Sequence, residues 1–161
     1  MPTKTFAPRD PDFERRVRAS FARQAVMHTL GATIEHVVPG EVGISLPFRA
    51  DLTQQHGFLH AGVAAAVLDS AAGYAALTLM ETGAGVLSIE FKVQLIAPAR
   101  GKWFRAVGRV VRAGRTINVV SAELRAHASA PVNGVFADAG EVVTLLNGTM
   151  MTVRDRPGLT D

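Results

Sequence analysis

Residues 60–80 read HAGVAAAVLDSAAGYAALTLM, an apolar run with a single acidic residue, Asp69, near its centre. Apolar side chains would occupy every side of a helix built from this run, so the helix must be surrounded by protein. A membrane span is disfavoured, because it needs about 20 apolar residues and a central aspartate costs roughly 3 kcal/mol on insertion scales. We therefore expect a buried central helix that ends near Gly83. Its many alanines allow strands, or a second copy of the helix, to approach closely.

The residues before this run predict one more helix and two strands. Apolar residues recur at four-residue spacing between Asp12, which is placed to cap a helix, and Gly31, which is placed to end it. Within 32–48, two apolar runs flank Pro39 and Gly40, a pattern typical of two strands joined by a tight turn. The apolar stripe of the first helix consists of Phe13, Val17, Phe21 and Ala25.

The residues after 84 predict strands. Strict alternation over 88–95 indicates a strand with one buried and one exposed face. Residues 102–112 and 116–126 flank Ala113 and Gly114 as in a hairpin, and 141–153 predicts a last strand. This alternation is typical of antiparallel sheets. We expect the buried face of 88–95 to carry Ile89, Phe91, Val93 and Leu95, and the exposed face to carry Ser88, Glu90, Lys92 and Gln94.

The order of elements predicts an α+β domain, in which one antiparallel sheet of five or six strands wraps around the long central helix, with the N-terminal helix in front. A length of 161 residues fits one domain. Residues 1–11 hold three prolines and are expected to be a flexible leader, 12–153 the domain, and 154–161 a polar tail. Such a sheet cannot cover a helix on all sides, so the uncovered flank predicts a dimer, in which two helices or two sheet edges meet.

Composition excludes several classes of protein. The chain has no cysteine, which excludes disulfides, thiolate metal sites and a cysteine nucleophile. Its 17 Lys and Arg against 14 Asp and Glu give a net charge of +3 that is spread along the chain, and aromatics are only 6%. We therefore expect an anionic small-molecule partner and neither nucleic acid nor membrane. The first residues lack the apolar stretch of a signal peptide, so we expect a cytoplasmic protein.

Asp69 and the turn before the helix are the candidate catalytic groups. A carboxylate within an apolar helix is costly unless it is paired, hydrogen-bonded or used in chemistry, and a structural role is the alternative. The turn at His60, Ala61 and Gly62 places backbone N–H groups at the helix start, where they favour an oxyanion. Ala61 and Asp69 lie about 12 Å apart along the axis, too far to serve one carbonyl carbon. Two antiparallel helices around a two-fold axis would bring Ala61 of one chain opposite Asp69 of the other.

The sequence around this turn and helix resembles that of the hotdog-fold thioesterases of the phenylacetate-degradation (PaaI) type. The resemblance rests on the His60–Ala61–Gly62 turn, the apolar helix with an aspartate seven residues after Gly62, the SIEF run at 88–91 and the GRT run at 114–116. It covers roughly residues 20–153, which is nearly the whole predicted domain. It implies a hotdog fold and a dimer, and relatives often pair two dimers into a tetramer.

The resemblance also implies roles for five residues. The Ala61 N–H would bind the oxyanion, and Asp69 of the partner subunit would attack the thioester or activate water. Gln54 would position the nucleophilic water or the thioester, Ser88 would help to hold that water, and His60 would orient the turn. One departure is Ala61, which stands where the family has the middle glycine of a His-Gly-Gly turn; it keeps the N–H but would be strained at positive φ.

The implied activity is hydrolysis of an acyl-coenzyme A to a carboxylic acid and the free thiol, without metal or other cofactor, coenzyme A being part of the substrate. Two alternatives stay open. One is a hotdog dehydratase on acyl thioesters, although the usual His-Phe-Pro element is absent. The other is a domain that binds acyl-CoA without turnover. His56 and His60 do not indicate a metal site, because no glutamate lies between them and Gly57 weakens a helix there.

Two sets of residues are candidates for substrate contacts. One is basic and could hold the phosphates of coenzyme A, although solvated hairpin charges are the simpler interpretation. The other is apolar or aromatic and could line an acyl pocket, although each member is equally a core residue. The basic set is Arg100, Lys102, Arg112 and Arg115, and the apolar set is Phe58, Leu59, Tyr74 and Leu77.

Overall fold

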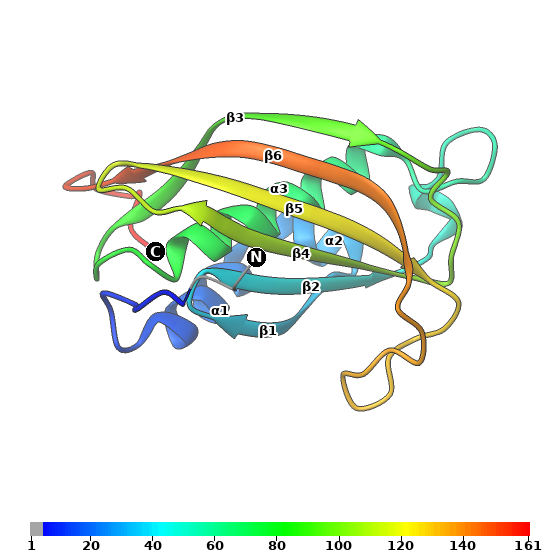
Figure 1. Ribbon diagram of the computed structural model, residues 1–161, viewed down its shortest axis with the longest axis horizontal. Helices are drawn as coiled ribbons and strands as arrows, with labels where there is room; N and C mark the ends of the chain where they lie inside the picture. Colours follow the sequence, from blue (N-terminus) through cyan, green and yellow to red (C-terminus); the bar gives the residue numbers. More distant parts are fainter. Residues whose placement is uncertain (1–4) are drawn as a thin grey trace.

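The computed structural model describes residues 5–161, and their fold is a curved antiparallel sheet around one long helix (Figure 1). The helices are α1 (Phe13–Arg23), α2 (Ala25–Leu30), the 3-10 helix η1 (Ala50–Leu52) and α3 (Ala61–Leu77). The strands are β1 (Thr33–Val38), β2 (Glu41–Pro47), β3 (Gly85–Leu95), β4 (Trp103–Arg112), β5 (Ile117–His127) and β6 (Glu141–Val153).

The sheet of the described residues has six strands in the order β1-β2-β4-β5-β6-β3, and every neighbouring pair is antiparallel. Helix α3 lies against its concave face and contacts β2, β3, β4, β5 and β6. At Gly108 of β4 the helix comes so close that a Cβ would lie 2.3 Å from the backbone of Ala71. The predicted α+β hotdog fold is confirmed, with the sheet at the upper end of the expected strand number.

The N-terminal helix differs from the single helix predicted over 12–31. It breaks at Gln24, whose φ of −82° and ψ of 95° are extended, and continues as α2 until Gly31 ends it at a φ of 68°. The Gln24 side chain donates to and accepts from the hydroxyl of Ser70 on α3, so the break turns a polar group toward α3. Asp12 does not cap α1 with its side chain; instead the carboxylate of Asp10 accepts from the Asp12 N–H at 2.9 Å.

Strand β3 corrects the predicted faces of 88–95. A β-bulge lies between Ser88 and Glu90, so Ser88 pairs with Met150, whereas Phe91 pairs with Gly148. Met150 and Gly148 share one face of β6, which places Ser88 and Phe91 on the same face of β3 instead of opposite faces. The expected buried face is largely exposed in the single chain, because β3 is an edge strand. Its exposed apolar side chains are Leu87 (41%), Ile89 (51%), Phe91 (41%) and Leu95 (60%).

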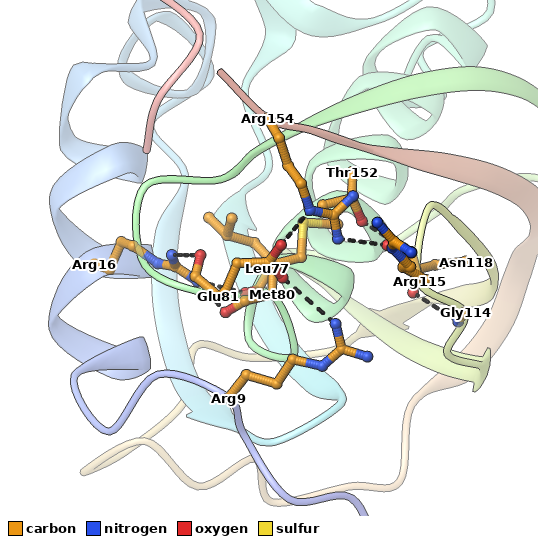
Figure 2. Close-up of polar contacts among 10 residues, drawn as sticks. All are labelled: Arg9, Arg16, Leu77, Met80, Glu81, Gly114, Arg115, Asn118, Thr152 and Arg154. Atoms are coloured by element: carbon orange, nitrogen blue, oxygen red, sulfur yellow. Dashed lines mark hydrogen bonds and ion pairs between the residues drawn. The ribbon is translucent and has the colours of Figure 1, made fainter. Parts of the chain in front are cut away.

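The C-terminal end of α3 is held by a buried arginine. Arg16 of α1 is only 8% exposed, and its guanidinium donates to the carbonyl oxygens of Leu77 at 3.0 Å, Met80 at 2.7 Å and Glu81 at 2.5 Å. The Leu77 carbonyl also accepts the Met80 N–H, and the Glu81 carbonyl also accepts the Ala84 N–H, so the guanidinium adds to the hydrogen bonds of the turn that follows α3. Around the same turn, Arg9 and Arg154 form ion pairs with the Glu81 carboxylate (Figure 2). This cluster fixes α1 and the end of β6 against the end of α3.

The segments outside the predicted domain also contact it where they are described. Residues 1–4 of the predicted leader lie outside the described residues. Of the remainder, Phe6 packs beside Gly40, and Asp10 is buried with its carboxylate 3.4 Å from the guanidinium of Arg16. The predicted tail 154–161 runs back beside the start of β3, where Asp161 accepts a hydrogen bond from the Val86 N–H. None of the helices within 5–161 has both the length and the hydropathy that crossing a membrane requires.

Candidate active site

The turn before α3 leaves one backbone donor free at the helix start. The His60 N–H donates to the Leu52 carbonyl at 2.9 Å, and the Gly62 N–H donates to Nδ1 of His60 at 2.8 Å. The N–H groups of Val63 and Ala64 both donate to the His60 carbonyl. The hydrogen bonds within 5–161 therefore leave only the N–H of Ala61 unused among the first residues of the helix. A free N–H at the positive end of a 17-residue helix suits an oxyanion.

His60 is the N-cap of α3, since its ring nitrogen accepts the Gly62 N–H. A Cβ at Gly62 would lie 3.0 Å from that nitrogen, so the glycine leaves room for the imidazole cap. Ala61 lies within the helix, and among the described non-glycine residues positive φ occurs only at Asn133 and Asp155. The alanine that replaces the family's glycine therefore fits this turn without backbone strain.

Asp69 lies two turns further along α3 and is fixed by strand β3. The Ser88 hydroxyl donates to Oδ1 of Asp69 at 2.6 Å, and the bulge after Ser88 is what turns this hydroxyl toward the helix. Asp69 is half-buried rather than enclosed. The structure thus brings together two of the predicted site residues, Asp69 and Ser88, as a carboxylate with one oxygen held and the other available.

A cavity of about 410 Å³ opens beside Asp69. Its walls come from α3, the break at Gln24, the first residues of β3 and the segment 158–161. Tyr74 lines it, and burial raises the pKa of this phenol, which therefore stays protonated and donates to Oε1 of Gln24 at 3.4 Å. A volume of this size lies in the range of small-molecule sites. Of the four apolar acyl-pocket candidates only Tyr74 lines this cavity; Leu59 and Leu77 are core residues, and Phe58 lies under the Arg100 guanidinium.

The remaining predicted residues lie elsewhere in the single chain. Gln54 accepts the backbone N–H of His56 with its side-chain oxygen, so its amide faces its own loop. All four basic candidates are exposed, but they fall at the two ends of β4, roughly 30 Å apart at about 3.3 Å per residue. Arg100 and Lys102 lie at the end that carries Ala61, because the Leu59 N–H donates to the Ala99 carbonyl. Arg112 and Arg115 lie at the hairpin end.

Among the polar residues of the cavity, Gln24 and Ser70 were not predicted from the sequence, whereas Tyr74 was an acyl-pocket candidate. Ser70 and Tyr74 stand at i and i+4 in a helix that is otherwise almost entirely apolar, which is a signal that the sequence contains. No sequence pattern marks Gln24, because it reaches the cavity only through the break between α1 and α2. Within 5–161, no group of three or more His, Cys, Asp or Glu side chains is arranged to hold a metal ion.

Comparison with known proteins identifies the family to which the chain belongs. A sequence model of the Thioesterase superfamily matches residues 56–129, which include both groups. The structure superposes with a TM-score of 0.79 on a Thioesterase family protein from Silicibacter pomeroyi, which is 44% identical, over 88% of this chain and 98% of that one. The chain therefore belongs to the thioesterase superfamily.

Two more distant relatives agree with this assignment. The E. coli PaaI protein from the phenylacetic acid degradation operon superposes with a TM-score of 0.75 over 88% of this chain and 94% of that one; at 17% identity it shows the shared fold. A "Putative esterase" of Halobacterium salinarum is 34% identical over 95 residues, 56% of this chain. The match spans 62% of that relative, less than two thirds of its length. The expected resemblance to hotdog thioesterases is confirmed.

Proposed function

We propose that this protein is a homo-oligomeric acyl-coenzyme A thioesterase that works without a metal or other cofactor. The observation that carries the proposal is the position of Asp69. Its carboxylate lines the cavity, and one carboxylate oxygen accepts a hydrogen bond from the Ser88 hydroxyl at 2.6 Å. A thiolate departs readily from a thioester carbonyl, so a carboxylate and an oxyanion donor suffice and no strong general acid is needed. A cytoplasmic location stays a prediction.

The second catalytic group has to come from another copy of the chain. Ala61 and Asp69 are eight residues apart on one straight helix, about 12 Å along its axis. Gly62 and Asp69 lie two turns apart on nearly the same side of α3, and the small side chains of Ala65 and Ala66 between them are only half-buried. This face lets an antiparallel second helix approach until Ala61 of one chain faces Asp69 of the other.

The exposed apolar side chains of β3 support the same assembly. Phe91 and Leu95 belong to the edge strand that pairs with β6, and a second copy would cover them. Isolated apolar surface residues are common, but several on one edge strand indicate an interface. The dimer, or a tetramer of two dimers, stays a proposal whose test is the mass in solution by light scattering.

In the proposed reaction, the thioester carbonyl oxygen points at the Ala61 N–H of one chain and its carbon faces Asp69 of the partner subunit. The Asp69 carboxylate either attacks the carbon itself or takes a proton from an attacking water. In both routes the carbonyl oxygen becomes an oxyanion beside the Ala61 N–H, the C–S bond breaks and the thiolate of coenzyme A leaves. Attack by Asp69 itself leaves the acyl group on the carboxylate as a mixed anhydride, which water then hydrolyses to the carboxylic acid and free Asp69, whereas attack by water gives the acid directly. The basic residues proposed for its phosphates are Arg100 and Lys102 at the Ala61 end of β4 and Arg112 and Arg115 at the hairpin end.

Hydrolysis of a panel of acyl-CoA thioesters, followed with a thiol-detecting reagent, tests the proposal. Release of thiol from at least one substrate is the expected result. Binding of acyl-CoA without thiol release would support the alternative of a non-catalytic sensor domain instead. Loss or gain of a double bond in the acyl chain without thiol release would indicate a dehydratase.

Asp69→Asn is expected to abolish hydrolysis while leaving the fold and the assembly intact. The amide keeps the shape of the side chain and still accepts from Ser88, but it neither attacks a carbonyl nor accepts a proton from water. The expected loss is a factor of about 100 or more in kcat, as for removal of a group that acts only in the transition state. Thiol release and light scattering measure the two outcomes, and activity near that of the wild type would contradict the role of Asp69.

A further inference from the structure

The segment 154–161, expected from the sequence to be a polar tail, closes part of the cavity that contains Asp69. Gly158, Leu159, Thr160 and Asp161 all line that cavity. We propose that residues 158–161, anchored by Asp161, form the far wall of the acyl pocket and thereby limit the length of the acyl group that the enzyme accepts. The proposal rests on the acyl-CoA thioesterase function and adds to it the substrate range.

The Asp161 carboxylate attaches this segment to two other elements. Its Oδ1 accepts from the hydroxyl of Ser20 on α1 at 2.5 Å and lies 3.6 Å from the guanidinium of Arg23. Its Oδ2 accepts from the backbone N–H of Val86 on β3 at 3.3 Å. Ser20 is only 7% exposed, so the carboxylate reaches into the interior between α1 and the edge strand. Loss of this side chain removes these three contacts with α1 and β3.

Gly85 provides a second, independent contact with the same segment. A Cβ at this position would lie 2.1 Å from the carbonyl oxygen of Leu159, a distance that no side chain tolerates. Gly85 is not among the described glycines with positive φ, so its strand backbone is open to any residue. The absence of a side chain is therefore needed for the approach of residues 158–161 and not for the backbone conformation of β3.

The wall lies a short distance beyond the catalytic carboxylate. Along β3, Val86 at the wall is two residues from Ser88 at Asp69, about 7 Å. Along α3, Tyr74 is five residues from Asp69, about 7.5 Å along the axis, and its hydroxyl lies 3.5 Å from that of Ser20, which holds Asp161. An acyl group whose carbonyl carbon is at Asp69 meets the wall after a few carbon atoms. Short acyl chains, or acyl groups with a single ring, are the substrate class that this distance admits.

Two variants remove the wall by different means. Asp161→Ala removes the anchor, and Gly85→Ala puts a methyl group where the Leu159 carbonyl lies. Arg156→Gln is the matched control, since it also removes a charge from the segment but lies outside the cavity lining. The measurement is kcat/KM for straight-chain acyl-CoA thioesters of increasing length. Release of the segment is measured separately, as the rate at which trypsin cuts after Arg154.

In both variants we expect faster cleavage after Arg154 and a shift of the optimum to longer acyl chains. The ratio of kcat/KM for a long to a short substrate should rise about tenfold for each two methylene groups newly buried. The Arg156→Gln variant should keep the wild-type profile. Faster cleavage after Arg154 without a change in the dependence of kcat/KM on acyl chain length would overturn the proposal. The proposal would also fail if neither variant changed the cleavage rate.

Failure of the proposed function would be visible separately. A wild-type protein that releases no thiol from any acyl-CoA is not an acyl-CoA thioesterase, whatever its pocket admits. The wall is then tested by calorimetric binding of the same acyl-CoA panel, where Asp161→Ala should again extend the accepted chain length. If Gly85→Ala does not fold, Asp161→Ala and its control decide the question alone.

Discussion

The hydroxyl of Ser88 determines which oxygen of Asp69 is available for chemistry. It donates to Oδ1 at 2.6 Å and also lies 3.3 Å from the sulfur of Met150, so it is fixed between the helix and β6. Oδ2 accepts none of the hydrogen bonds described within residues 5–161. A carboxylate held at one oxygen has fewer orientations to lose when it meets the thioester carbon, which lowers the entropic part of the barrier. In the proposed reaction Ser88 is therefore a positioning residue.

Ser88→Ala is expected to lower kcat about tenfold and to leave KM nearly unchanged, because one positioning hydrogen bond is lost and no substrate contact is. Ser88→Thr keeps the hydroxyl on a residue that strands favour, and it should restore most of the rate. Steady-state hydrolysis of the best acyl-CoA substrate measures both. Equal loss of rate in the alanine and threonine variants would show that the site needs the volume of serine and not its hydroxyl.

The sequence predicted the place of Asp69 better than that of Ser88. Asp69 was evident from the sequence, since a carboxylate within an alanine-rich helix needs a physical reason. Ser88 was identified through the family resemblance, but alternation placed it on the exposed face of its strand. The bulge after Ser88 reverses that, and a bulge depends on how β6 pairs with β3, which the strand's own residues do not reveal.

At the scale of elements, the sequence predicted one helix correctly and missed a break in another. Helix α3 was predicted from its composition, because a run that is apolar on every side has to be the centre of the fold. The break between α1 and α2 was not, because the apolar stripe continues through it to Ala25. Gln24 leaves the helix to exchange hydrogen bonds with Ser70, a contact between residues 46 apart that outweighs local helix propensity.

The end of α3 is attached to the rest of the molecule through charges, and this gives it a dependence on pH. The side-chain hydrogen bond from Arg154 is the main cause that lowers the pKa of Glu81 to about 2, and Arg9 adds to it. A carboxyl group whose pKa is lower in the folded than in the unfolded chain stabilises the fold above its unfolded pKa. That contribution is lost as the pH falls from about 4.5 to about 2.

Glu81→Gln should therefore lower the melting temperature at neutral pH by a few degrees, the effect of a partly exposed ion-pair cluster of at most about 1 kcal/mol. The difference from the wild type should shrink as the pH falls through this window, since the wild-type carboxylate is then protonated. Thermal unfolding followed by circular dichroism at a series of pH values measures it. Glu141→Gln, an exposed glutamate outside the cluster, is the control, and a difference that stays constant down to pH 2 would contradict the assignment.

At the scale of the whole molecule, the proposed site needs two copies of the chain. One chain offers the Ala61 N–H and the Asp69 carboxylate at separate points on one helix, and the face between them carries small, half-buried side chains. Two chains around a two-fold axis would make two sites, each with Ala61 from one chain and Asp69 from the other. An experiment can distinguish a site shared by two chains from a site within one chain. If Ala61 is altered in one chain and Asp69 in the other, a shared site can still form from the two unaltered groups, whereas a site within one chain cannot.

Ala61→Pro removes the N–H alone, since proline is favoured at the first position of a helix and His60 has the extended backbone that a residue before proline needs. Ala61→Gly, which keeps the N–H, is its control. Ala61→Pro and Asp69→Asn should each be inactive as pure proteins. When the two chains are produced together, each mixed dimer has one doubly defective site and one intact site. Random pairing should then restore about a quarter of the wild-type rate of thiol release. Mixed dimers, isolated by two different affinity tags, that remain inactive would show that Ala61 and Asp69 do not meet across the subunits.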